Sequence, residues 1–241
     1  MTEGTALQGM KRYAAGAALV QALLLIGCSG PAPAPSPTPT PTATAAAVAR
    51  PAGPERLVLA FGDSLYAGYG LDRGQSLPDA IQARLRTGGI NATIVNAGVS
   101  GDTSAAGRQR LGFVLDNLPR PPDLVLLGLG GNDVLRQIPA AETRANMTAM
   151  LDLLRQRNVP VVLTGMKAPP NLGADYVTAF DGIWPDLAHR DRAGLYPFVL
   201  DGVIGDPALM QADRVHPNAA GVARIADRVT PMVAQRLAPA A

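Results

Sequence analysis

Two side chains of this sequence, Ser64 and His216, have the chemistry that nucleophilic catalysis needs. A serine hydroxyl is a weak nucleophile until a base removes its proton, and the base needs a third group to orient it. Asp213 precedes His216 by three residues, so on a turn its carboxylate can reach Nδ1 while Nε2 faces a substrate. The same Asp-x-x-His spacing also arises by chance and in helix caps. His189, the other histidine, lies among charged residues and is typical of a surface position.

Hydrogen-bond donors for a developing negative charge are the second requirement of acyl transfer. The candidates are the backbone N–H groups of Ser64 and Gly101 and the side-chain amide of Asn132. Taken singly, Gly101 is equally consistent with an ordinary turn and Asn132 with a helix cap. Their occurrence in this order, together with Ser64 and His216, favours a shared oxyanion hole.

Short apolar runs precede these donors and predict the strands that position them. The runs are rich in Leu and Val and do not alternate with polar residues, which is typical of a parallel sheet covered on both faces. Strands are predicted at 57–61, 92–95, 124–129, 159–164 and 195–200, and helices at 78–86, 105–118, 142–157, 175–189 and 218–237. This alternation predicts a doubly wound α/β fold. Sites in such sheets gather at the carboxyl ends of strands, where Ser64, Gly101 and Asn132 are expected.

These motifs together resemble the four blocks of the SGNH/GDSL hydrolase family. The blocks are Gly62-Asp63-Ser64, Gly101, Asn132 and Asp213-x-x-His216. Within the family, the chain is most similar to the bacterial arylesterase/acyl-CoA thioesterase/lysophospholipase branch, and the likeness spans roughly residues 57–237. The segments that carry this second likeness are Asn96-Ala-Gly-Val-Ser-Gly-Asp-Thr-Ser104, Gly128-Leu-Gly-Gly-Asn-Asp133 and Gly165-Met-Lys-Ala-Pro-Pro-Asn-Leu-Gly173.

The resemblance implies a role for each motif residue. It makes Ser64 the nucleophile, His216 the base and Asp213 its orienter, with Ser64, Gly101 and Asn132 as the oxyanion hole. It also implies a flavodoxin-like three-layer α/β/α sandwich with a mainly parallel five-stranded sheet, and a reaction without metal or cofactor. Tyr66 stands where a Gly-x-Ser-x-Gly motif would have its last glycine, which argues against the nucleophile elbow of α/β-hydrolases.

The segments after the third and fourth predicted strands are expected to border the substrate. Leu135, Ile138, Leu172 and Tyr176 are candidates for an acyl groove, although each is equally consistent with ordinary packing. Apolar walls favour acyl or aryl esters, lysophospholipids among them, with thioesters as further candidates. Two alternatives remain open: a carbohydrate or peptidoglycan O-acetylesterase, and a non-catalytic envelope lipoprotein.

The N-terminal part has the pattern of an export signal rather than of a folded domain. Lys11 and Arg12 precede an apolar run that ends at Cys28, the chain's single cysteine. Such a run is short for a membrane span but suits a signal peptide, and its end resembles a bacterial lipobox. We therefore expect a lipoprotein signal at 1–27, a lipid-bearing Cys28 that opens a Pro/Thr/Ala-rich linker at 28–54, and a hydrolase domain at 55–241. Met10 is an alternative start.

Composition narrows the partners further. The formal net charge is only +2, without clustered basic residues, which argues against nucleic-acid binding. One cysteine and two histidines are too few for a disulfide framework within the chain or for a zinc site built on Cys and His. The expected partners are a small-molecule or lipid ester and a membrane of the bacterial cell envelope, which would hold the lipid anchor. Nothing in the sequence indicates an oligomeric state.

Overall fold

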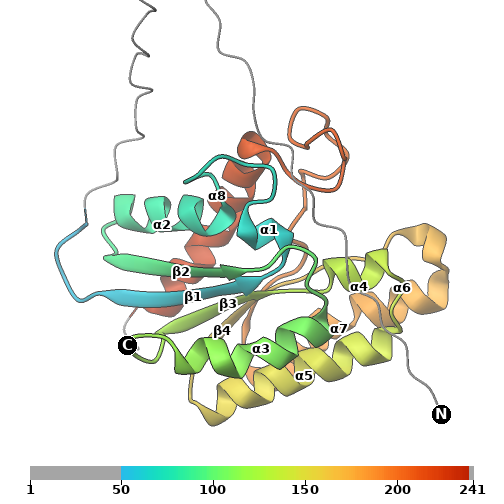
Figure 1. Ribbon diagram of the computed structural model, residues 1–241, viewed down its shortest axis with the longest axis horizontal. Helices are drawn as coiled ribbons and strands as arrows, with labels where there is room; N and C mark the ends of the chain where they lie inside the picture. The colour runs from blue at the N-terminus through green and yellow to red at the C-terminus, as the bar shows by residue number, and fades with distance from the viewer. Residues whose placement is uncertain (1–49, 239–241) are drawn as a thin grey trace, which may run out of the picture. The chain divides into compact units, whose positions relative to one another are not determined.

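The computed structural model describes residues 50–238, which contain a five-stranded sheet (Figure 1). Every neighbouring pair is parallel, and the strand order is β2-β1-β3-β4-β5. The strands are β1 (Arg56–Gly62), β2 (Ala92–Gly98), β3 (Leu124–Gly128), β4 (Val161–Thr164) and β5 (Gly194–Tyr196). The predicted parallel five-stranded sheet is therefore confirmed, in the order of a flavodoxin-like fold.

Helices cover both faces of this sheet. α2 packs against α8 on one face, whereas α3 packs against α5 on the other (Figure 1). The helices are α1 (Ser64–Ala67), α2 (Leu77–Thr87), α3 (Ser104–Asp116), α4 (Gly131–Leu135), α5 (Ala140–Gln156), the 3₁₀ turn η1 (Pro170–Leu172), α6 (Ala174–Asp181), α7 (Ile183–Asp191) and α8 (Ala219–Leu237). The three-layer sandwich follows from these two helical layers.

The local sequence explains why these elements form. β1 is a run of apolar residues that is buried from Leu57 to Phe61, as a central parallel strand requires. α2 begins with a capping box, in which the Ser76 and Asp79 side chains each accept a backbone N–H from the other residue. α5 buries one helical stripe that includes Met147 and Leu154.

Two predicted elements are interrupted in the structure at residues that explain the change. The strand predicted at 195–200 stops at Tyr196, because Pro197 has no N–H with which to continue the ladder. The helix predicted at 175–189 is divided into α6 and α7 at Gly182. Pro185 lies in the first turn of α7, where a backbone N–H has no helical partner and proline is tolerated.

The predicted signal peptide, lipidated Cys28 and most of the linker lie outside the described residues. Within residues 50–238, no helix is long and apolar enough to cross a membrane.

Candidate active site

Ser64, His216 and Asp213 form one continuous hydrogen-bonded chain. Ser64 is the first residue of α1, directly after β1, while Asp213 and His216 lie in the segment that leads from β5 to α8. His216 Nε2 lies 2.9 Å from Ser64 Oγ, and its Nδ1 lies 2.6 Å from Asp213 Oδ2. The structure thus joins residues 152 positions apart in the geometry that activates a serine.

The turn around Asp213 fixes the orientation of its carboxylate. Oδ1 accepts the backbone N–H groups of Val215 and His216, which leaves Oδ2 for the imidazole. The hydrogen bond from the His216 side chain, followed by that from the His216 backbone, lowers the pKa of Asp213 to about 2. An ionised Asp213 holds the ring proton on Nδ1, so Nε2 is free to accept the Ser64 hydroxyl proton.

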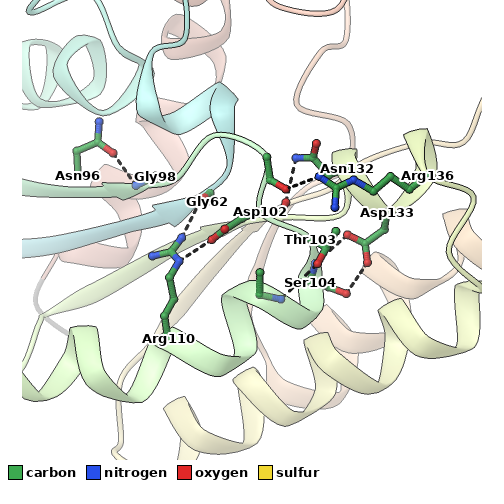
Figure 2. Close-up of polar contacts among 12 residues, drawn as sticks. Gly62, Asn96, Gly98, Asp102, Thr103, Ser104, Arg110, Asn132, Asp133 and Arg136 are labelled. Atoms are coloured by element: carbon green, nitrogen blue, oxygen red, sulfur yellow. Dashed lines mark hydrogen bonds and ion pairs between the residues drawn. The ribbon is translucent and has the colours of Figure 1, made fainter. Parts of the chain in front are cut away.

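Two hydrogen bonds join the loop after β2, which carries Gly101, to α4 and its C-cap residue Arg136; the Asn132–Asp102 bond is seen in Figure 2. Asn132 Nδ2 donates to the Asp102 carbonyl at 2.9 Å, and Arg136 Nη2 donates to the Gly101 carbonyl at 3.0 Å. Gly101 has a φ of 87°, a left-handed conformation that favours glycine. An amide NH₂ has two hydrogens, so Asn132 retains a second donor.

The backbone N–H groups of Ser64 and Gly101 complete the predicted set of donors. Neither is paired with an acceptor among the hydrogen bonds of residues 50–238. Ser64 N–H belongs to the first turn of a helix, where N–H groups have no intrahelical acceptor. These groups are therefore available to an anionic oxygen.

A buried carboxyl group on α4 itself anchors the Asn132 side of the site. Asp133 is fully buried and accepts hydrogen bonds from Ser104 N at 2.8 Å and Ser104 Oγ at 2.5 Å (Figure 2). It also accepts a hydrogen bond from Thr143 Oγ1 at 3.0 Å. Burial of a charge is costly unless it is hydrogen-bonded, and three donors offset that cost. Asp133 thereby ties α4 to α3 and α5.

An ion pair supports the Gly101 side in the same way. Arg110 on α3 lies 2.6 Å from Asp102 and donates to the Gly62 carbonyl at 2.9 Å (Figure 2). Its guanidinium stacks on the Phe61 ring, 3.9 Å from the centroid. Arg110 thus links the end of β1 to the loop that carries Gly101. Neither Arg110 nor Asp133 was predicted to have a role, although Asp133 lies inside one of the motifs.

Asp63, like Asp133, lies in one of the motifs but was not predicted to have a role. It lies between β1 and the nucleophile, is only 3% exposed, and accepts the Leu65 N–H to cap α1. Burial raises its pKa to about 6, against the opposing effect of the Leu65 hydrogen bond. A titratable group therefore borders Ser64 at the base of the cavity.

A cavity of about 500 Å³ opens beside Ser64 and His216. Its walls are mainly apolar and come from the carboxyl ends of β1, β3 and β4 and from the segment before α8. The residues that line it are Asp63, Ser64, Leu65, Gly131, Asn132, Val134, Leu135, Met166, Lys167, Ala168, Pro169, Pro170, Phe198, Leu200, Ile204, Arg214, Val215 and His216. Its size and character suit an organic acyl group.

Only one of the four residues predicted to form an acyl groove lines this cavity. Leu135 lines it, whereas Ile138, Leu172 and Tyr176 do not. Tyr176 instead donates its hydroxyl to the Ile138 carbonyl and stacks on Phe180, and Leu172 packs against the core. Phe198, Leu200 and Ile204 supply the missing wall. All three follow β5, and Phe198 and Leu200 lie where the sequence had predicted a strand.

His189 has an exposed position at the end of α7, as predicted for a surface histidine. Among residues 50–238, no group of three His, Cys, Asp or Glu side chains is arranged to hold a metal ion.

Comparisons with known proteins agree on one family. The model of the GDSL-like lipase/acylhydrolase family matches residues 60–224. Esterase TesA of Pseudomonas aeruginosa is 39% identical over 174 residues, which cover 72% of this chain and 86% of the relative. Thioesterase 1/protease 1/lysophospholipase L1 of Escherichia coli is 35% identical over 170 residues, covering 70% and 79%. The solved structure of AlinE4, an SGNH-hydrolase family esterase, has a TM-score of 0.66 and 52% identity over 78% of this chain and 99% of its own.

Proposed function

The chain belongs to the GDSL-like lipase/acylhydrolase family and is a hydrolase that acts on ester bonds, and from this premise we propose that Ser64, His216 and Asp213 cleave esters of apolar acyl groups through an acyl-enzyme. The observation that carries the proposal is the unbroken hydrogen-bonded chain from Ser64 Oγ through His216 to Asp213. The family assignment leaves no place for the non-catalytic lipoprotein considered above.

The first half of the reaction forms the acyl-enzyme. Ser64 Oγ attacks the carbonyl carbon while His216 Nε2 takes the hydroxyl proton, and the carbonyl π pair moves onto oxygen. That oxyanion accepts hydrogen bonds from Ser64 N–H, Gly101 N–H and the second hydrogen of Asn132 Nδ2. When the tetrahedral intermediate collapses, the bond to the leaving oxygen breaks, and His216 donates its proton to that oxygen. The alcohol leaves, and the acyl group stays on Ser64.

The second half uses the same groups with water as the nucleophile. His216 takes a proton from water, the new C–O bond forms, and the Ser64–acyl bond breaks as Oγ regains a proton. A carboxylic acid is released and the free enzyme returns. Asp213 stays ionised throughout and stabilises the imidazolium that forms in each half.

The cavity supports a substrate with an acyl chain longer than acetate. Its volume of about 500 Å³ is larger than an acetyl group can fill, and its walls of Leu, Val, Met, Pro and Phe side chains suit an apolar chain. This favours acyl or aryl esters and lysophospholipids over the O-acetylesterase alternative. Thioesters present the same acyl carbonyl to Ser64 and are included in the proposal.

Hydrolysis of p-nitrophenyl esters from acetyl to palmitoyl tests this proposal directly. With a fragment of residues 46–241, which contains every described helix and strand, we expect a rate that peaks at medium chains and depends on Ser64. Activity confined to the acetyl ester would contradict the acyl-chain assignment. Equal rates for the wild type and Ser64→Ala would contradict the nucleophile.

We also propose that Cys28 carries a lipid that anchors the enzyme in the bacterial cell envelope. The support is the sequence alone: basic residues, an apolar run and a single cysteine at its end. Expression in bacteria with labelled palmitate should label the wild type but not Cys28→Ser. Equal labelling of the two proteins would refute the anchor without affecting the hydrolase proposal.

A further inference from the structure

Exposed apolar side chains gather around the entrance of the active-site cavity. Six large hydrophobic residues are exposed among residues 50–238: Tyr69, Val99, Phe113, Leu135, Ile204 and Val215. Three of them, Leu135, Ile204 and Val215, also line the cavity, with exposed fractions of 62%, 51% and 38%. Single exposed apolar residues are normal on a protein surface, whereas a group around an opening indicates an interaction site.

Two positive charges share this entrance. Lys167 and Arg214 are exposed and line the same cavity. Neither takes part in the ion pairs found among residues 50–238. The only carboxylate in the lining is Asp63, which lies buried at the base. Among the residues that line the cavity, the exposed charged side chains are therefore both cationic.

The backbone holds Arg214 at this position. Its φ of 57° is left-handed, an uncommon state for a residue with a side chain. The turn is closed by Arg214 N–H to the Gln211 carbonyl and by Asp213 Oδ1, which accepts the next two backbone N–H groups. The turn that orients the Asp213 carboxylate toward His216 thus also places Arg214 beside the cavity.

We propose that this entrance surface, formed by Leu135, Lys167, Ile204, Arg214 and Val215, docks onto an anionic lipid surface. Apolar side chains can enter the boundary between headgroups and acyl chains, while Lys167 and Arg214 meet the lipid phosphates. Docking in this orientation turns the opening of the cavity toward the lipids. The inference rests on the proposed function, because it makes the lipid surface the source of the acyl substrates.

Flotation with vesicles tests docking independently of catalysis. Residues 46–241 with Ser64→Ala are mixed with vesicles of ether-linked phosphatidylglycerol or ether-linked phosphatidylcholine, which offer no ester to cleave. We expect stronger partitioning onto phosphatidylglycerol. Ile204→Gln should lower the partitioning about tenfold, because the variant lacks an apolar side chain that docking would bury in the lipid. Arg214→Gln should lower it about fivefold, an effect that fades in high salt.

Phe113→Gln is the matched control. Phe113 on α3 is the most exposed of the six apolar side chains, at 71%, and does not line the cavity. Partitioning of this variant should stay within about twofold of the parent. Three results would overturn the proposal: no binding to phosphatidylglycerol vesicles, equal losses in Phe113→Gln and Ile204→Gln, or equal binding to both lipids. Ester hydrolysis with Ser64 restored tests the proposed function separately.

Discussion

The cavity beside Ser64 lies where the strands end, at the carboxyl edge of the sheet, and a smaller cavity lies where the strands begin, at its amino edge. The two cavities differ in what their charged side chains do. The smaller one, of about 320 Å³, lies at the starts of β4 and β5 and is lined by Arg155, Asp191, Arg192 and Arg236 among others. Asp191 pairs there with Arg155 and Arg190. No serine, cysteine, threonine, histidine or lysine is among its lining residues.

The contrast shows that crowded charge is not sufficient for chemistry. At the carboxyl edge, strand ends turn into α1 and α4, so donors at helix starts and a serine are presented to the cavity. At the amino edge, Asp191 instead forms ion pairs with Arg155 and Arg190. Four substitutions test the contrast, in order of decreasing expected effect.

Loss of the base should have the largest effect. His216→Ala leaves Ser64 without a proton acceptor, so kcat should fall by roughly 10⁴–10⁶-fold on p-nitrophenyl octanoate. The circular dichroism spectrum should not change. His189→Ala is the matched control and should retain wild-type turnover. A His216→Ala rate within tenfold of the wild type would place the base elsewhere.

Loss of one oxyanion donor should have a smaller effect. Asn132→Ala should lower kcat by about 10²–10³-fold, with little change in KM, because the lost hydrogen bond belongs to the transition state. Asn132 also binds the Asp102 carbonyl, so the melting temperature must be measured alongside. An increase in KM at constant kcat would argue that Asn132 binds substrate rather than the oxyanion.

Asp63→Asn should alter how stability depends on pH. Burial raises the folded-state pKa of Asp63 from 3.8 to about 6. The folded form therefore binds this proton more tightly, and the resulting stability is present at low pH and lost as pH rises from about 4 to 6. Asparagine can still accept the Leu65 N–H, so the variant should gain up to about 3 kcal/mol relative to the wild type between pH 4 and 7.

Urea unfolding at several pH values measures this difference. If the difference in unfolding free energy between Asp63→Asn and the wild type is the same at pH 4 and pH 7, the raised pKa is refuted.

Disruption at the amino edge should matter least. Arg155 is 61% exposed in its side chain, and exposed ion pairs contribute little. Arg155→Ala should change the free energy of unfolding by about 0.5 kcal/mol or less and leave kcat/KM unchanged. A loss of activity comparable to that of Asn132→Ala would end the distinction between the two edges.

The parts of the molecule that could be predicted from the sequence are those whose structure depends on residues close together in the chain. Continuous apolar runs marked β1 and β3, and the polar residues directly after them identified Ser64 and Asn132. The role of Asp63 was not accessible, because the raised pKa comes from burial by residues distant in the chain. Arg110 was missed for the same reason: its contact with the Gly62 carbonyl spans 48 residues.

The cavity wall was the least predictable part. Tyr176 was predicted to border the substrate and Phe198 to lie within a strand, yet Phe198 lines the cavity and Tyr176 does not. β5 ends at Tyr196, and the segment that follows it contributes Phe198 to the cavity. Tyr176 on α6 instead stacks on Phe180 and donates its hydroxyl to the Ile138 carbonyl. Those outcomes depend on where strands and helices end, which tertiary packing decides.

Labelling with a fluorophosphonate, followed by peptide mass spectrometry, tests the central claim most directly. We expect one covalent adduct, on Ser64, formed with loss of fluoride and in step with the loss of esterase activity. Ser64→Ala should form no adduct, and His216→Ala should react far more slowly. An adduct on another serine, or full esterase activity with Ser64 replaced, would contradict the account.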